Sequence, residues 1–197
     1  MIGEFAKRLM RFFGFYPQND GVTEMKPVID DATCIQRLML NEGCKLKSYY
    51  DTEHNLTIGI GRNLDDNPLT EEEICRVGHN GRQLCITNEQ ANYLCRNDLK
   101  RVRADLDKYL PWWRDLNPDR QFVMIDLCFN MGIGNEKKKT KLLSFTKTLP
   151  LIAQGYYEQA AHNLLKSKYA KQTGIRAKRN AYCLKYGTYL TQLPKEW

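Results

Sequence analysis

The sequence lacks long apolar runs and is sparing with glycine and proline. None of its apolar stretches approaches the roughly 20 residues that a helix needs to span a bilayer, so no transmembrane segment is predicted. With 13 Gly and 7 Pro among 197 residues, collagen-like and low-complexity chains are excluded. Hydrophobic residues make up 42% and charged residues 27%, a balance typical of a globular chain with a buried core.

Acidic residues are missing from one long tract of the chain. Between Ala160 and Lys195 there is no Asp or Glu, while Lys and Arg accumulate. The whole chain has 30 basic against 23 acidic residues and a formal net charge of +7. This excess predicts a polyanionic partner, such as nucleic acid, an anionic membrane surface or an acidic cell-wall polymer. Because no recognisable nucleic-acid motif accompanies the tract, we expect no specific nucleic-acid partner.

The seven cysteines include no C-x-x-C pair. An odd number leaves at least one thiol outside any intrachain disulfide, and several fall at apolar helical positions, where a thiol behaves as a small hydrophobe. We therefore expect mostly buried, reduced thiols, as in a chain that folds in a reducing cytoplasm. Cys75, His79, Cys85 and Cys95 match no common zinc spacing, so we expect no metal site.

Residues 1–30 are predicted to be a basic amphipathic extension followed by a linker. Phe, Leu and Met are interleaved with Lys7, Arg8 and Arg11, and Gly and Pro follow from residue 14. The apolar core is too short and interrupted for a secretory signal peptide, so none is evident. Two interpretations stay open: a helix packed on the main domain, or an anchor that docks to a surface, a virion component or the protein's own cleft.

A helix is predicted from Asp30 or Asp31 to Glu42, with Gly43 directly after its end. Ile35, Leu38, Met39 and Glu42 are spaced to share one face. Glu42 then lies on an apolar stripe near the negative end of the helix dipole. Both effects favour a protonated carboxyl, which is what a general acid requires. A salt-bridged Glu at a helix end is the plainer alternative.

The next segment, 47–61, predicts a β-hairpin that turns around Thr52–Asn55. In its second strand Thr57, Gly59 and Gly61 point to one face. Glycines weaken a strand, so we expect a ligand or another part of the chain to approach closely there. A tight turn would bring Asp51 near Thr57 across the ladder.

These residues fall into blocks with a recognisable order. Glu42-Gly43 precedes Asp51 by nine residues, and Thr57-Ile58-Gly59-Ile60-Gly61 begins six residues after Asp51. Later blocks are Phe129-Asn130-Met131-Gly132 and the stretch 163–189. Together, over residues 32–193, they resemble the phage-type lysozymes of glycoside hydrolase family 24. The resemblance implies an α+β, mainly helical, lysozyme-like fold in which a long helix joins a small β-hairpin lobe to an all-helical lobe.

The resemblance also implies an activity, hydrolysis of the β-1,4 bond between N-acetylmuramic acid and N-acetylglucosamine in peptidoglycan. Glu42 would be the general acid, while Asp51 and Thr57 would position water, an arrangement typical of an inverting mechanism. Gly61 would form the floor beside them. The remaining implied substrate contacts are Asn63, Phe129, Asn130, Thr148, Asn163 and Arg176, with Arg176 near the catalytic Glu. No cofactor is implied.

Four features depart from the family pattern. Arg62 stands where the phage enzymes have His, so an ion pair made by that residue is altered and cannot be switched off by pH. Asn63 replaces an apolar cleft position, and Gly174-Ile175 replaces the usual Pro-Asn. The lysine-rich stretch 136–141 lengthens a loop.

For the whole chain we expect an extension over 1–30 and a catalytic domain over 31–197, with a β lobe at about 44–86 and a helical lobe at about 88–193. Capping patterns predict helices that begin near Thr70, Asn88 and Asn117. Further helices are predicted over 141–154, 157–168 and 176–186. We expect a monomer that is made in the cytoplasm and acts on the periplasmic or extracellular wall, with virion association as one route. A lytic transglycosylase, a non-catalytic wall-binding module of a virion or secretion machine, and a nucleic-acid binder are the alternatives.

Overall fold

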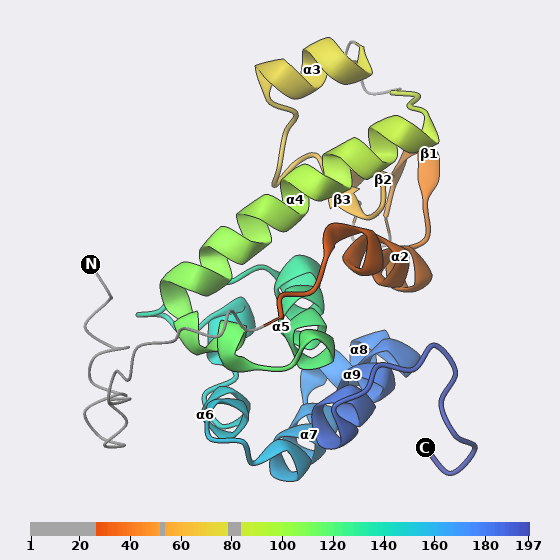
Figure 1. The fold of residues 1–197 in the computed structure, drawn as a ribbon. Helices are drawn as coiled ribbons and strands as arrows, with labels where there is room; N and C mark the ends of the chain where they lie inside the picture. The colour runs from red at the N-terminus through yellow and green to blue at the C-terminus, as the bar shows by residue number, and fades with distance from the viewer. Residues whose placement is uncertain (1–26, 52–53, 79–83) are drawn as a thin grey trace. The chain divides into compact units, whose positions relative to one another are not determined.

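The computed structural model describes residues 27–51, 54–78 and 84–197. These residues form a mainly helical chain with one small antiparallel sheet, which confirms the predicted α+β, lysozyme-like class (Figure 1). Two compact units are present, residues 30–101 and residues 102–197, the latter including the described residues 27–29. Most of the predicted N-terminal extension, His79 and the hairpin residues 52–53 lie outside the described residues.

The first unit, called the sheet unit below, holds the sheet and the helices around it. Its sheet has the order β1-β2-β3. The elements are α2 (Asp31–Glu42), β1 (Lys45–Tyr50), β2 (Leu56–Gly59), β3 (Arg62–Asn63), α3 (Glu71–Val77) and the first part of α4 (Asn88–Tyr109). The boundary between the two units falls inside α4, after Arg101.

Helix starts in the sheet unit follow the capping residues that the sequence predicts. Asp30 accepts a hydrogen bond from the Thr33 amide at 2.9 Å and so caps α2. Thr70 and Glu73 form a complete capping box at α3. At α4 the Thr87 hydroxyl accepts from the Gln90 amide at 3.2 Å, and the Gln90 side chain accepts from the Thr87 amide at 2.8 Å.

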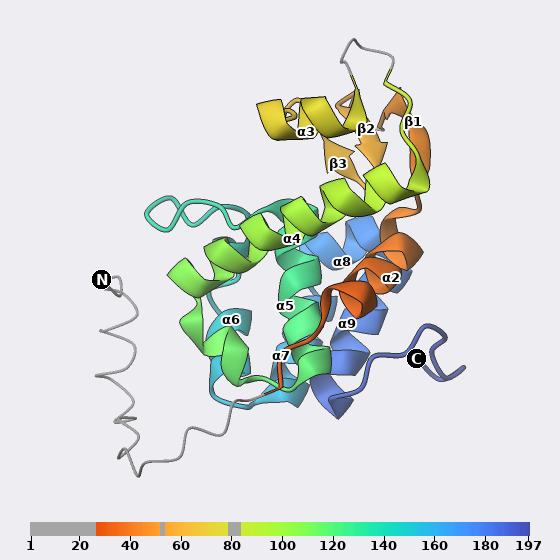
Figure 2. The same cartoon turned by 45° about the horizontal axis from the view of Figure 1, so that its top comes forward.

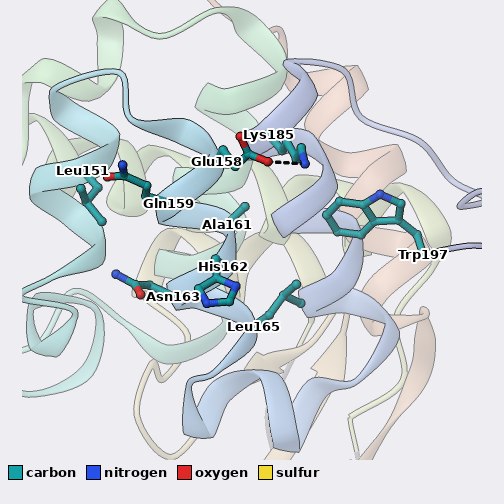
Figure 3. A pocket seen from close by; sticks show the side chains of 9 residues that line it. All are labelled: Leu151, Glu158, Gln159, Ala161, His162, Asn163, Leu165, Lys185 and Trp197. Carbon is teal, nitrogen blue, oxygen red and sulfur yellow. Dashed lines mark hydrogen bonds and ion pairs between the residues drawn. The ribbon is translucent and has the colours of Figure 1, made fainter.

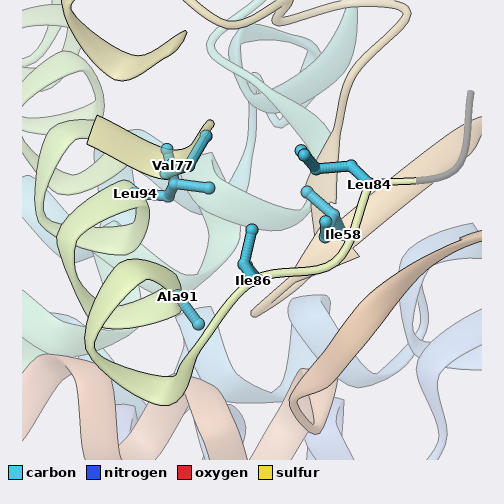
Figure 4. Packing of buried hydrophobic residues seen from close by; sticks show 6 residues of the cluster. All are labelled: Ile58, Val77, Leu84, Ile86, Ala91 and Leu94. Atoms are coloured by element: carbon cyan, nitrogen blue, oxygen red, sulfur yellow. The ribbon is translucent and has the colours of Figure 1, made fainter. Parts of the chain in front are cut away.

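The sheet packs on α4 through a small apolar core (Figure 4). Ile58 of β2 is fully buried and belongs to one cluster with Leu94 of α4 and Val77 of α3. Leu84 and Ile86 join this cluster from the segment beside β1, where the Ile86 amide donates to the Leu46 carbonyl at 2.8 Å. The hairpin is therefore held by apolar burial on its inner face as well as by its own ladder.

Arg62 of β3 ties the sheet to α3 and α4 through a buried network. The residue is 3% exposed, and its guanidinium donates to both carboxylate oxygens of Glu73, at 2.8 and 2.7 Å, and to Asp98 Oδ1 at 3.1 Å. Its remaining donors reach the carbonyls of Asn67 and Pro68, both at 3.1 Å. All five guanidinium N–H groups thus have acceptors, which is the condition for burying this charge.

The two carboxylates of this network have pKa values displaced in opposite directions. Burial alone would raise the pKa of Glu73, but hydrogen bonds from Arg62, the Thr70 amide and Asn97 outweigh burial and lower it to about 2. Burial dominates at Asp98 and raises its pKa to about 6, although Arg62 and Arg101 oppose the shift.

The second unit, called the helical unit below, is built around α5 (Pro118–Met131), which begins with Asn117 as its N-cap and ends at Gly132, as the sequence predicts. Every residue from Gln121 to Cys128 is buried, so α5 is covered on all sides. In both views α5 lies between α6 and α9 (Figures 1 and 2). The other elements are η1 (Pro111–Asp115), η2 (Lys141–Ser144), α6 (Thr148–Ala153), α7 (Tyr157–Leu165), α8 (Lys168–Thr173) and α9 (Ile175–Tyr186).

Two of the predicted helices are divided in the structure. The segment predicted as one helix over 141–154 forms η2 and α6, and the segment 157–168 ends at Leu165 and restarts as α8. Pro150 explains the first division, because in a continuous helix its ring would meet the carbonyl four residues earlier. In α6 it lies in the first turn, where its missing N–H breaks no helical bond.

No helix among residues 27–51, 54–78 and 84–197 is long and apolar enough to cross a membrane. All seven cysteines are free thiols, and Cys34, Cys95, Cys128 and Cys183 are buried.

Replacing Arg62 by Met should lower the free energy of unfolding by about 3–5 kcal/mol, because buried Glu73 then loses its cation and Asp98 keeps only the partly exposed Arg101. Arg101 pairs with the same Asp98 but is 40% exposed, so Arg101→Met should cost at most about 1 kcal/mol. Urea unfolding at neutral pH measures both losses. Equal losses would show that the Arg62 network contributes no more than a surface pair.

The network should also give stability a pH dependence with two opposite parts. The pKa of Glu73 is below its ordinary 4.5. The contribution of Glu73 to the free energy of unfolding is therefore full above about pH 4.5 and is lost as the pH falls toward about 2. The pKa of Asp98 is above its ordinary 3.8. Its contribution to the free energy of unfolding is therefore full below about pH 3.8 and is lost as the pH rises through about 6. Unfolding free energies across this range should show Glu73→Gln removing the first dependence and Asp98→Asn the second. The same pH profile in both variants would contradict this assignment.

Candidate active site

Glu42 is the last residue of α2, directly before a glycine that ends the helix. Gly43 has φ +72° and donates its N–H to the Met39 carbonyl at 2.9 Å. The buried stripe of α2 consists of Cys34, Ile35 and Leu38, and Glu42 follows it half-buried. Met39, expected on this stripe, is instead 39% exposed. The carboxyl therefore lies at the end of an apolar stripe, as predicted, although the stripe is centred one residue earlier on the helix.

Gly61 lies against the side chain of Glu42. A Cβ on Gly61 would lie only 3.0 Å from Glu42 Cδ and Oε2, and φ at Gly61 is +70°. Both conditions require glycine here. Gly59 serves a different contact, because a Cβ there would meet Ile86 at 3.5 Å and Ala91 at 3.6 Å. A close approach was expected at both glycines, and the structure shows one at each. At Gly61 the neighbour is the carboxyl group of Glu42, and at Gly59 the neighbours are Ala91 of α4 and Ile86, which precedes α4.

Asp51 stands where β1 runs into the hairpin turn, and Asn55 holds it. The Asn55 amide donates to Asp51 Oδ1 at 2.8 Å, and Asn55 Nδ2 donates to Oδ2 at 3.2 Å. In return, the Asp51 amide donates to the Asn55 carbonyl at 3.0 Å. Both carboxylate oxygens are therefore oriented by one residue, which the sequence placed in the turn without giving it a role.

Thr57 and Asp51 both hydrogen-bond to Asn55. The Thr57 hydroxyl, in a side chain that is 4% exposed overall, donates to the Asn55 carbonyl at 3.2 Å, the oxygen that also accepts from the Asp51 amide. On the ladder Thr57 pairs with Tyr49, so Asp51 is its diagonal neighbour. The structure thus brings Asp51 and Thr57 together around Asn55, as the tight turn predicts.

The Tyr49 hydroxyl is affected by the charges of both carboxylates, and no function was predicted for this residue. Burial raises the pKa of the Tyr49 hydroxyl, and the negative charges of Glu42 and Asp51 raise it further. Its ring also carries the Lys45 ammonium, 3.8 Å from the centroid. The charges of both carboxylates therefore act on the same phenol. Alternation along β1, which puts Tyr49 and Asp51 on one face, is the signal that could have identified it.

Asn63, a predicted substrate contact, shapes a turn. Its side-chain oxygen accepts from the amides of Asp65 at 2.9 Å and Asp66 at 3.0 Å, and its carbonyl accepts from Asn67 at 3.0 Å. This turn follows β3 directly, so Asn63 stabilises the strand that carries Arg62. A sugar contact by Asn63 stays a prediction.

Arg176, buried at the start of α9, forms a two-bond ion pair in the helical unit. Its Nε donates to Asp126 Oδ2 at 3.0 Å and its Nη2 to Oδ1 at 2.8 Å. Asn180 also donates to Asp126 Oδ2, at 2.6 Å, and to the Tyr169 hydroxyl at 3.0 Å. Burial, followed by the charge of Asp126, raises the pKa of Tyr169. The role of Arg176 beside the catalytic Glu stays a prediction, and its partner Asp126 was not foreseen.

The other predicted substrate contacts also lie in the helical unit. Phe129 and Asn130 are near the end of α5, the first half-buried and the second exposed. Thr148 of α6 and Asn163 of α7 line one hollow of about 310 Å³, called the Thr148 hollow below, together with Lys166 and Ser167. The structure therefore brings Thr148 and Asn163 together.

Comparisons with known proteins place the chain in a family. The family model described as phage lysozyme matches residues 40–182. The pre-baseplate central spike protein Gp5 of Enterobacteria phage T4 is 30% identical over 174 residues, which cover 83% of this chain and 29% of the spike protein. Probable T4-type lysozymes 1 and 2 of Dictyostelium discoideum are each 28% identical, over 77% of this chain and 92% of their own length. The chain belongs to the phage lysozyme family.

Gly61→Ala should displace the Glu42 carboxyl, because the new methyl group would lie 3.0 Å from its carbon. Gly59→Ala is the matched control, since its φ of +64° imposes similar backbone strain while its methyl makes ordinary contacts. Both variants should lose roughly 1–2 kcal/mol of stability from the positive φ. Only Gly61→Ala should shift the carbon NMR signal of the Glu42 carboxyl. An unmoved signal would mean that Gly61 does not set the position of Glu42.

Proposed function

We propose that this protein hydrolyses the β-1,4 bond between N-acetylmuramic acid and N-acetylglucosamine in bacterial peptidoglycan. Membership of the phage lysozyme family supports the class of reaction. The observation that carries the proposal is the position of Glu42 against Gly61, which follows the hairpin strand that holds Thr57 beside Asp51 at Asn55. One carboxyl at an apolar helix end and one fixed on a polar turn can take different roles in acid catalysis.

In this proposal Glu42 protonates the glycosidic oxygen as the bond breaks. Its half-buried place after Leu38 limits the water around it, and the bare backbone of Gly61 gives the carboxyl room at the surface of the sheet. The protonated acid supplies the proton that the leaving sugar needs, and the sugar that remains develops positive charge at its anomeric carbon.

Asp51 and Thr57 hold the attacking water. The Asp51 carboxylate is oriented by two N–H groups of Asn55 and accepts a proton from the water. The Thr57 hydroxyl donates to the Asn55 carbonyl and offers its oxygen lone pairs to the water's other hydrogen. Since both groups hydrogen-bond to Asn55, this residue supports both partners of the water.

Charge contributes attraction to an acidic wall polymer. The chain has a formal net charge of +7. Part of the basic tract serves the fold, because Arg176 pairs with Asp126, Lys185 with Glu158, and Arg179 with the Thr191 carbonyl. The remaining exposed lysines give a long-range field that salt would screen.

A second candidate function is a wall-binding module of a virion. The 30% identity to a phage spike protein favours it, although the match covers only 29% of that protein's length. Such a module would bind peptidoglycan without releasing fragments. A lytic transglycosylase would use the same acid but would not need the water held by Asp51 and Thr57.

Glu42→Gln should fold normally and lose lysis of purified cell walls by about 100- to 10,000-fold, the range expected for a general acid. Glu89→Gln, at an exposed position in the first turn of α4, is the matched control and should lyse walls normally. The decrease in turbidity of a wall suspension measures both rates.

Asp51→Asn separates the alternatives in the same assay. Hydrolysis should be lost, whereas a transglycosylase should keep cleaving. Walls that bind wild-type protein without any loss of turbidity would support the virion module. Full lysis by Glu42→Gln would refute the acid assignment.

A further inference from the structure

A second and larger hollow lies beside the Thr148 hollow in the helical unit. It measures about 600 Å³ and opens over α7, with α6, α9 and Trp197 at its edges (Figure 3). We call it the Trp197 hollow. Its volume is within the range of roughly 300–1,000 Å³ that small-molecule sites occupy. Trp197 stands at one end, and Leu151 with Gln159 stands at the other.

The indole of Trp197 is fixed in place by aromatic neighbours on α9. Its ring makes edge contacts with Tyr182, at a centroid distance of 5.1 Å and 75°, and with Tyr186, at 6.0 Å and 68°. The Lys178 ammonium donates to the Trp197 carbonyl at 2.7 Å. A tryptophan held in this way offers a rigid apolar surface, which loses little conformational entropy when a ligand binds.

The lining of the hollow holds one acidic and one basic side chain, with the imidazole of His162 beside them. Lys185 forms an ion pair with Glu158 at 2.5 Å, drawn as a dashed line in Figure 3, so its charge is balanced within the lining. The amides of Gln159 and Asn163 add planar donors and acceptors. A phosphate or nucleotide would need an unbalanced cation, whereas a neutral ligand with hydroxyl and amide groups matches these side chains.

We infer that the Trp197 hollow is an accessory subsite for an N-acetylated hexosamine of a glycan strand. The C–H face of such a sugar stacks on an indole, its hydroxyls pair with Glu158, Lys185 and the amides, and its acetyl methyl fits the apolar Leu151 or Leu165. The inference rests on the proposed function, because a glycan substrate is what would bring the strand to this unit.

Asn163 connects the subsite to the predicted sugar contacts. It lines both the Trp197 hollow and the Thr148 hollow. A strand that touches Thr148 and Asn163 therefore continues over α7 toward Trp197 without leaving the surface of the helical unit. The subsite would lengthen the bound strand and raise affinity for polymer over short fragments.

Chitotriose, a trimer of N-acetylglucosamine, is the probe that tests the subsite. The chain has three tryptophans, so the indole N–H region of a nitrogen–proton NMR spectrum has few signals, and Trp197→Phe assigns one of them. Titration of full-length Glu42→Gln protein should move the Trp197 signal saturably and leave the buried Trp113 signal in place. Trp197→Ala should weaken binding about tenfold. Trp112→Ala, a half-buried tryptophan outside the hollow, is the matched control and should bind normally.

The outcomes test sugar binding at the Trp197 hollow independently of catalysis. A saturable Trp197 shift, together with weaker chitotriose binding by Trp197→Ala in the remaining amide signals, supports the subsite even if wild-type protein fails to lyse walls, which would count against the proposed function alone. A Trp197 signal that does not move, in protein whose wild type lyses walls, overturns the subsite and leaves the function standing. Equal weakening by Trp112→Ala would also overturn it.

Discussion

The buried guanidinium of Arg62 is the interaction on which the sheet unit depends. It joins β3 to α3 through Glu73 and to α4 through Asp98, and it fixes the turn at Asn67 and Pro68. The residue before it is Gly61, where even a Cβ would lie only 3.0 Å from the Glu42 side chain. The charge network therefore supports the part of the chain that lies against the proposed acid. Arg, unlike His, keeps its charge at every pH at which the protein is folded, so this support does not titrate at the cation.

The helical unit has a similar arrangement at its centre. Asp126 lies fully buried on α5 and receives hydrogen bonds from Arg176 and Asn180 of α9. A buried carboxylate of this kind is costly unless its partners are complete, so it fixes the relative placement of the two helices. Through α9 it also supports the aromatic residues around Trp197. In each unit a buried ion pair joins elements that carry or support residues of the proposed site or of the inferred subsite.

Local features of the fold could be predicted from the sequence, because capping and turn residues act within a few positions. Asp30, Thr70 and Asn117 begin their helices as expected, and the hairpin forms with Asp51 and Thr57 around Asn55. The spacing of Glu42 from Leu38 placed it correctly at the end of the buried stripe. Met39 was misassigned because an apolar residue beside the stripe fits helical periodicity as well as one within it.

Features that depend on distant partners could not be predicted in this way. Arg62 meets Glu73 and Asp98 across 11 and 36 residues, and Arg176 meets Asp126 across 50. No local pattern indicates such pairs, since each residue alone has the character of a surface charge. Tyr49 was missed for a related reason, because its importance comes from two carboxylates supplied by different elements. The division of the segment 141–154 was foreseeable, since Pro150 limits where a helix can begin.

The central claim is that Glu42 donates a proton while Asp51 and Thr57 deliver water to the sugar. Digestion of purified peptidoglycan in water enriched in the heavy oxygen isotope, followed by mass analysis of the fragments, tests it most directly. The account predicts reducing N-acetylmuramic acid ends that carry one heavy oxygen from the solvent. Fragments that end in 1,6-anhydro sugar and carry no label would contradict it.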